Sequence, residues 1–144
     1  MRIYLDNCCF NRPFDDQAQA RIWLETVAKL RIQDRIILGE IELAWSYILD
    51  FENQASPFEE RRTVVAAWKQ HAVVGIEESP AVLEEARRLA ASGLRSKDAL
   101  HVSCAVAASC DYFLTTDDAL LSKLSTYTHL RCIDPTMFVR ETEP

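Results

Sequence analysis

The chain has 144 residues, of which 49% are hydrophobic and 26% are charged, and its formal net charge is −6. This length fits one domain, so we expect residues 1–144 to fold as a single unit, and the composition is that of a globular rather than a disordered chain. The acidic balance argues against a broad basic surface for nucleic acid, although bound divalent ions would themselves attract phosphate.

The sequence contains no run that approaches the ~18 apolar residues of a membrane span, and Met1 leads directly into a strand pattern without a basic and apolar leader. We therefore expect a cytoplasmic protein with no membrane segment. Five cysteines occur without any C-x-x-C spacing. This pattern predicts reduced thiols in the core rather than a disulfide framework or a zinc ribbon.

The first half of the chain alternates strand and helix patterns. Short apolar runs predict strands, and apolar residues at helical spacing predict helices. In chain order these are a strand at 2–5, a turn at 11–13, a helix at 17–29, a strand at 41–46 and a helix at 47–53. Residues 35–40 either extend the second strand or connect to it, and Ser46 is placed to cap the helix that follows.

The second half continues the alternation. It predicts a helix at 57–72, a strand at 73–78, a helix at 80–92 between a Ser79 cap and a Gly93 stop, a helix at 96–110, a strand at 112–116, a helix at 118–126, a strand at 130–133 and a short tail at 135–141. Strands that alternate with helices favour an α/β fold. We predict three α/β/α layers around a mostly parallel central sheet of four or five strands.

Four acidic residues stand at the boundaries of these elements. Asp6 and Asp117 follow two predicted strands, and parallel strands of an open sheet gather ligands outside their carboxyl ends, so both acids should face one crevice. Taken singly, each acid has an ordinary explanation as a turn residue, a helix-terminal charge or a solvated helix residue. Taken together, their order favours a site for Mg²⁺ or Mn²⁺, which prefer oxygen ligands.

Four motifs carry a resemblance to a known family: a hydrophobic strand followed by Asp at the start, S-x-x-x-x-x-E in SYILDFE, KDALH opening a helix, and FLTTDD before another helix. Over nearly its whole length the chain resembles PIN-domain proteins. The resemblance implies a small metal-dependent ribonuclease of the kind that includes VapC-type toxins, with an antitoxin partner and a homodimeric state. It also implies that the catalytic, metal-binding acids are Asp6, Glu52, Asp98 and Asp117, with Asp118 as an adjacent ligand or support.

The chain departs from this family after its first acid. Such domains often show Asp-Thr-Asn or Asp-Ser-Ser, whereas here Asp6 is followed by Asn7 and Cys8, which removes the usual hydroxyl. Thr115 and Thr116 match the polar residues that precede the last acid.

The second acid has alternatives nearby. Glu40, Glu42 and Asp50 all lie close to Glu52 in the sequence. Glu52 is favoured because it stands about a turn and a half into the helix after Ser46, from where it can point back across the strand ends. Asp50 is the alternative.

Other conspicuous side chains favour ordinary roles. His101 follows Asp98 by one helical turn and could contact a ligand or orient an acid, but its apolar helix favours a structural role. The tryptophans at 23, 45 and 68 fall on apolar faces and indicate core or interface packing. The helices near 20–30 and 58–70 could provide a homodimer face or a groove for an antitoxin.

The leading hypothesis is therefore a Mg²⁺- or Mn²⁺-dependent endoribonuclease that hydrolyses RNA phosphodiesters. One alternative is a catalytically weak PIN-like module that binds RNA or protein, and another is a structure-specific DNA nuclease. A phosphotransfer receiver domain also carries acids at strand ends, but it needs an acidic pair directly after the first strand, and Asp15-Asp16 lies too far downstream.

Overall fold

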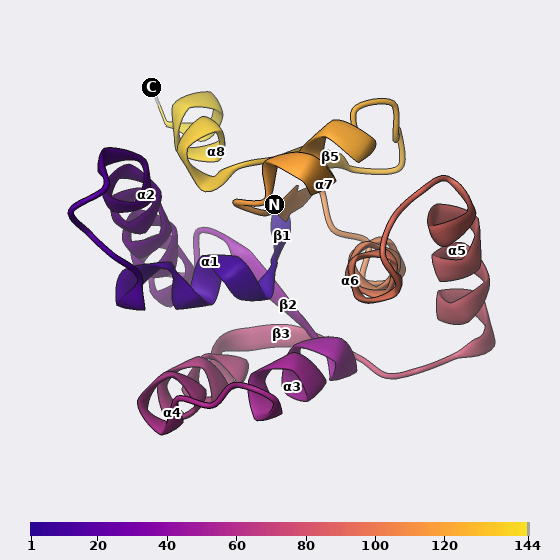
Figure 1. Ribbon diagram of the computed structural model, residues 1–144, viewed down its shortest axis with the longest axis horizontal. Coiled ribbons are helices and arrows are strands. Elements are labelled where there is room, and N and C mark those ends of the chain that lie inside the picture. The colour runs from indigo at the N-terminus through magenta and orange to yellow at the C-terminus, as the bar shows by residue number, and fades with distance from the viewer. Residues whose placement is uncertain (144) are drawn as a thin grey trace.

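A sheet of five parallel strands lies at the centre of the computed structural model, which describes residues 1–143 (Figure 1). The strands are β1 (Arg2–Leu5), β2 (Glu42–Ser46), β3 (Ala72–Ile76), β4 (Tyr112–Leu114) and β5 (Arg131–Ile133). Their order across the sheet is β3-β2-β1-β4-β5. This order differs from the 2-1-3-4-5 arrangement of receiver-type folds, so the phosphotransfer alternative does not fit.

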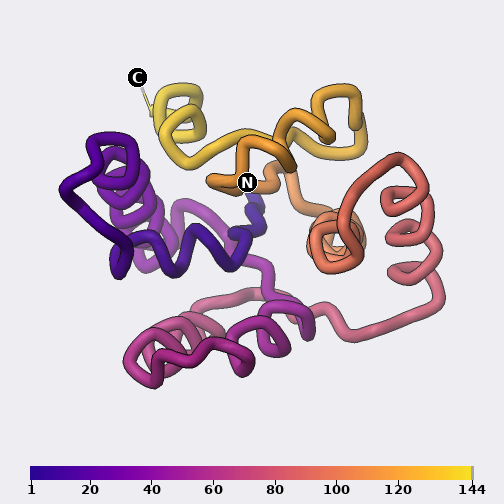
Figure 2. Tube along the Cα trace, viewed as in Figure 1, coloured from indigo at the N-terminus to yellow at the C-terminus, as the bar shows by residue number. Residues whose placement is uncertain are grey.

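Helices cover both faces of the sheet. They are α1 (Asn7–Asn11), α2 (Ala20–Ile37), α3 (Tyr47–Gln54), α4 (Glu59–Trp68), α5 (Pro80–Ala91), α6 (Ser96–Ala107), α7 (Asp118–Lys123) and α8 (Pro135–Thr142), with short 3₁₀ turns at Arg12–Phe14 and Lys69–His71. Figure 2 shows α2 and α8, far apart in the sequence, packed side by side, while α5 and α6 pack together on the other side. This is the predicted three-layer α/β/α fold. Within residues 1–143 no helix combines the length and apolarity that crossing a bilayer requires.

The sheet has its topological switch point at β1. On one side Ile3 is in register with Leu43 of β2, and on the other Leu5 is in register with Leu114 of β4. The Asp6 amide donates to the Leu114 carbonyl at 2.9 Å, which holds the carboxyl ends of β1 and β4 together. A crevice forms where connections from adjacent strands leave in opposite directions, so the ends of these two strands are the expected place for a ligand.

The strands supply the core because a parallel sheet is covered on both faces. Tyr4 and Phe113 are fully buried and stack with ring centres 5.6 Å apart. Trp45 is buried against Phe10, whereas Trp23 remains about half exposed. All five cysteines are free and three of them are buried, in agreement with the prediction of core thiols.

The structure corrects three predicted elements. The region predicted to turn at 11–13 is preceded by helix α1, which begins because the Asp6 carboxylate accepts from the Asn7 amide. The predicted helix at 17–29 runs instead from Ala20 to Ile37, so residues 35–37 end this helix and residues 38–40 form the connection to β2 rather than an extension of the strand. The tail at 135–141 is helix α8, with Asp134 as its cap.

Candidate metal centre

The four predicted acids come from four different elements. Asp6 follows β1, Glu52 lies on α3, Asp98 stands in the first turn of α6, and Asp117 caps α7. The Asp117 carboxylate accepts from the Leu120 amide at 3.1 Å, which fixes one of its oxygens. The fold thus brings acids separated by more than a hundred residues to one end of the sheet.

Thr115 links the acids that follow β1 and β4. Its hydroxyl donates to Oδ2 of Asp6 at 2.8 Å and accepts from the Asp117 amide at 3.2 Å. The other Asp6 oxygen accepts from the Asn7 amide at 2.8 Å. Asp6 is almost completely buried. Its carboxylate is therefore held in one orientation by neighbours that come from both strand ends.

His101 lies between Glu52 and Asp6. The imidazole Nε2 forms a hydrogen bond with Oε1 of Glu52 and lies 3.9 Å from Oδ1 of Asp6. The Asn7 side chain donates to the other Glu52 oxygen at 3.4 Å. One potential ligand atom from each of Asp6, Glu52 and His101 lies within 4.8 Å of the others.

A hydrogen bond at Nδ1, the ring nitrogen that does not contact Glu52, fixes the orientation of the His101 ring. His101 is fully buried, and its Nδ1 is 2.6 Å from the Tyr4 hydroxyl, which in turn is 2.6 Å from Oγ of Ser46. An ionised carboxylate only accepts, so Nε2 carries the proton directed at Glu52. The sequence favoured a structural role for His101 and left open that it orients an acid, but helix periodicity could not show that this acid is Glu52, on another helix.

A cleft of about 350 Å³ opens above these residues. It is lined by Glu52, Arg95, Ser96, Lys97, Asp98 and Asp117. Burial raises the pKa of Asp98 above its ordinary value, and the nearby charges of Asp6 and Asp117 raise it further. The carboxylates of this cleft therefore repel one another.

Burial also raises the pKa of Glu52, but the hydrogen bond and charge of His101 and the charge of Lys97 act in the opposite direction. The net result is a pKa below the ordinary value of a glutamate. Glu52 thus stays ionised in a half-buried position.

This donor set fits a divalent cation. Carboxylate oxygens are the ligands that Mg²⁺ and Mn²⁺ prefer, and Asp6 and Glu52 carry them within reach of a common point. Burial, and then the negative charges of Asp6 and Asp117, raise the pKa of Asp98, so positive charge in the cleft would stabilise its ionised form. A bound cation would supply that charge.

Asp118 lies outside this lining. Its side chain is 67% exposed, and its carboxylate accepts from the Arg21 guanidinium at 2.6 Å. Arg21 lowers the pKa of this carboxyl through that hydrogen bond. Asp118 therefore stands apart from the residues that line the cleft and pairs with Arg21 of α2.

The alternatives to Glu52 point elsewhere. Asp50 accepts from the Trp45 indole and from Lys69, each at 2.9 Å. Glu42 lies at the start of β2, the end of the strand opposite to the acids, and Glu40 stands in the turn before it. Of these candidates only Glu52 lines the cleft with Asp98.

A thiol takes the place where the family often has a hydroxyl. Cys8 Sγ lies 3.5 Å from Oδ2 of Asp6 and 3.3 Å from Oγ1 of Thr115. It also accepts from the Thr116 amide at 3.4 Å. Cys8 therefore still packs against the first acid, but with the longer and weaker contacts of sulfur.

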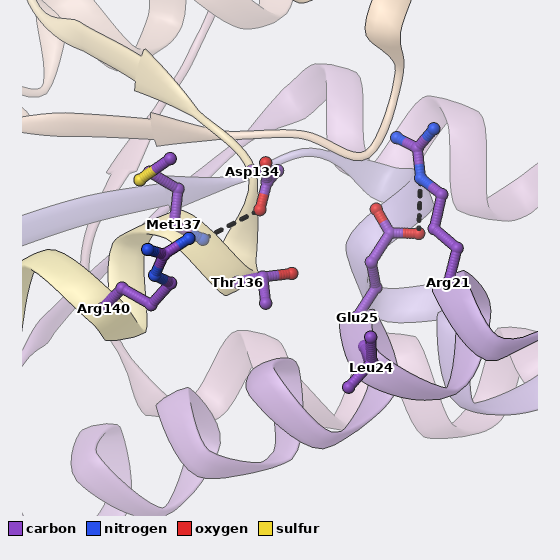
Figure 3. Close-up of a pocket in the computed structure, with 7 residues that line it drawn as sticks. All are labelled: Arg21, Leu24, Glu25, Asp134, Thr136, Met137 and Arg140. Carbon is purple, nitrogen blue, oxygen red and sulfur yellow. Dashed lines mark hydrogen bonds and ion pairs between the residues drawn. The ribbon is translucent and has the colours of Figure 1, made fainter.

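A second hollow, of about 360 Å³, lies between α2 and α8 (Figure 3). Both acidic residues that line it already form ion pairs or hydrogen bonds. Glu25 is buried and pairs with Arg21 at 3.6 Å and with Arg12 at 3.1 Å, while Asp134 accepts from the Met137 amide at 2.9 Å. This hollow offers no group of acids comparable with the cleft at the strand ends.

Comparison with known proteins identifies the fold family. A family model described as PIN domain matches residues 3–125. The chain belongs to the PIN-domain family. No curated protein matches it in sequence.

Solved structures share this PIN fold at low sequence identity. FitAcB from Neisseria gonorrhoeae has a TM-score of 0.57 at 13% identity, covering 92% of this chain and 97% of that one. VapBC2 from Rickettsia felis, bound to a DNA fragment from their promoter, has a TM-score of 0.58 at 12% identity with the same coverage. DNA-bound VapBC from Salmonella typhimurium has a TM-score of 0.55 at 15% identity, covering 94% and 98%.

Proposed function

We propose that this PIN domain is a Mg²⁺- or Mn²⁺-dependent endoribonuclease that hydrolyses RNA phosphodiesters. The observation that carries the proposal is the cleft in which Glu52, Asp98 and Asp117 gather beside Asp6. Burial and the nearby charges of Asp6 and Asp117 disfavour the ionised form of Asp98, and a cation there would offset both effects. Family membership supports the same reading, since PIN domains are generally nucleases.

Asp6, Glu52, Asp98 and Asp117 would hold the ion. When bound, a divalent ion lowers the pKa of the attacking water and stabilises negative charge on the phosphoryl oxygens. Thr115 and His101 keep the carboxylates of Asp6 and Glu52 in fixed orientations, so little reorganisation is needed when substrate arrives.

The exposed side of the cleft carries positive charge suited to the substrate. Arg95 and Lys97 line it together with Ser96. Their charges would draw an RNA phosphate toward the acids, which would otherwise repel it. The local charge pattern therefore supports a phosphodiester substrate despite the net charge of −6.

A toxin role with an antitoxin partner is the second part of the proposal. Helix α2 carries Trp23, Leu24, Val27 and Leu30, each about half exposed. Their spacing forms one apolar stripe, and such a stripe accepts the apolar face of a partner segment. Homodimerisation remains a prediction from the family resemblance.

RNA cleavage tests the proposal. Purified protein is incubated with single-stranded and structured RNA and with DNA, in Mg²⁺ or Mn²⁺ and in EDTA. We expect metal-dependent RNA products that Asp98→Asn and Asp117→Asn reduce by at least ~100-fold, because each removes a charged cation ligand. Asp34→Asn, an exposed acid on α2, is the matched control.

Cleavage that persists in EDTA would contradict the metal-dependent mechanism. Cleavage of DNA alone would favour the DNA nuclease alternative. A folded protein that binds RNA but cuts neither substrate in either metal would favour the binding module.

A further inference from the structure

An apolar hollow adjoins the acidic cleft. It has a volume of about 280 Å³ and is lined by Tyr47, Ile48, Phe51, Glu78, Lys97 and Leu100. Helices α3 and α6 form most of it, and the segment between β3 and α5 completes it. Lys97 lines both the hollow and the acidic cleft, and Phe51 directly precedes Glu52. A chain that binds at the acids can therefore continue into this hollow.

We propose that the hollow receives one unpaired nucleobase of the substrate, while Lys97 contacts the phosphate between that base and the bond to be cut. This inference rests on the proposed nuclease function and adds a subsite to it.

Phe51 gives the hollow a surface for stacking. Its side chain is 59% exposed, and within residues 1–143 it forms no close aromatic pair. Every nucleobase presents a π face, so an exposed ring beside a backbone-binding groove binds single strands with little sequence preference. Ile48 and Leu100 add apolar walls. The Glu78 carboxylate at this hollow can accept from an exocyclic amino group of a base.

The positive charges of Lys97 and Arg95, where the hollow meets the acidic cleft, suit a phosphate. Among the residues that the structure describes, Lys97 and Arg95 form no ion pair and donate no side-chain hydrogen bond, although acids line the same cleft. Helix α6 begins beside them at Ser96 without a side-chain cap. Free amide groups and a positive helix end favour an anion at this place. The phosphodiester backbone is the anion that would also reach the acids.

The position of the hollow beside the acidic cleft favours an unpaired base. A base in a duplex is stacked and paired, and it can enter a side pocket only after leaving the stack. We therefore expect single-stranded RNA to bind more tightly than the same sequence in a duplex. A second copy of this chain is the rival occupant of an apolar hollow, and the experiment below separates the two.

Fluorescence anisotropy tests the inference. A short fluorescein-labelled RNA, single-stranded or annealed to its complement, is titrated in Mg²⁺ with protein that carries Asp98→Asn to prevent cleavage. Added Phe51→Ala should weaken single-strand binding roughly 5- to 100-fold and change duplex binding little. Phe51→Tyr keeps a ring and should retain the affinity. Phe58→Ala is the matched control, since Phe58 is 54% exposed and lies at the start of α4.

The salt dependence of binding tests Lys97 separately. Lys97→Gln should lower the slope of log K against log salt by about 1, as expected for the loss of one phosphate contact. Lys123→Gln, an exposed lysine at the end of α7, should leave the slope unchanged.

Three outcomes would overturn the inference. Equal RNA affinities for Phe51→Ala and Phe58→Ala would remove the base subsite while cleavage by the unaltered protein still supports the nuclease function. Dissociation of a dimer by Phe51→Ala in light scattering would assign the hollow to a second copy. Absence of RNA binding and of cleavage by the unaltered protein would contradict the nuclease function and the subsite together.

Discussion

At the scale of single residues, Thr115 determines how the first acid is held. Its hydroxyl contacts Asp6 and accepts from the amide of Asp117. Thr115→Val keeps the shape but removes both hydrogen bonds, so we expect Mn²⁺ affinity to fall roughly 10- to 100-fold, the usual cost of losing a partner that orients a metal ligand. Calorimetric titration with Mn²⁺ measures this. Unchanged affinity in Thr115→Val would show that Asp6 needs no such support.

Lys29 is a buried cation that forms no ion pair within residues 1–143. Its Nζ lies 5.6 Å from the ring centres of both Phe10 and Trp68, and burial lowers its pKa to about 8. Because this folded pKa is below the unfolded value near 10.5, the unfolded state binds more protons between about pH 8 and 10.5. The free-energy cost of burying the Lys29 charge is therefore full below that window and disappears as the pH rises through it.

Lys29→Met should then stabilise the protein at pH 7 by roughly 2 kcal/mol, since a pKa unit corresponds to ~1.4 kcal/mol and the two rings offset part of the burial cost. The gain should shrink as the pH rises toward 10. Urea unfolding at several pH values measures it, with Lys123→Met as an exposed control. A gain that does not change with pH would rule out this origin.

At the scale of elements, α2, α5 and α6 end in the same way. After each of these helices the chain enters a left-handed residue, namely Gly39 with φ 77°, Gly93 with φ 116° and Ser109 with φ 57°. At each end two amides close back on the last turn, as when Ser109 donates to Val106 and Cys110 donates to Ala105. Of these three helices, α6 alone uses a residue with a side chain at this position.

Ser109→Gly should therefore stabilise the protein by roughly 0.5–1 kcal/mol, because glycine adopts this backbone conformation without steric cost. Gly39→Ser, the reciprocal change after α2, should destabilise it by a similar amount. Thermal unfolding compares the two. Destabilisation by Ser109→Gly would show that the serine side chain contributes more than its backbone strain costs.

The elements that the sequence predicted best were those with long periodic patterns and clear ends. Ser79 and Gly93 bounded α5 as expected. Helix α1 was missed because five residues are too few to show a periodic pattern. Its only sequence signal was the capping residue Asp6, which was interpreted as a metal ligand. Helix α8 was treated as a tail although Asp134 followed by Pro135 is a helix-start signal.

At the scale of the whole molecule, the tendency of ligands to collect at strand ends is enough to predict that Asp6 and Asp117 lie together. The positions of Glu52 and Asp98 came from the family resemblance, and the fold brings both to the same cleft. The contact of His101 with Glu52 was not predicted, because it depends on how α3 and α6 pack, and periodicity within one helix carries no information about that packing.

Binding of Mn²⁺ to the protein after treatment with a chelator tests the central claim most directly. Calorimetric titration should show saturable binding that Asp98→Asn weakens at least ~10-fold and Asp34→Asn leaves unchanged. Of these two residues, Asp98 lies among the converging acids and Asp34 does not. Binding should also raise the Tm of the unaltered protein. A folded protein that binds no Mn²⁺ or Mg²⁺, or that binds equally well after Asp98→Asn, would contradict a metal centre at the strand ends.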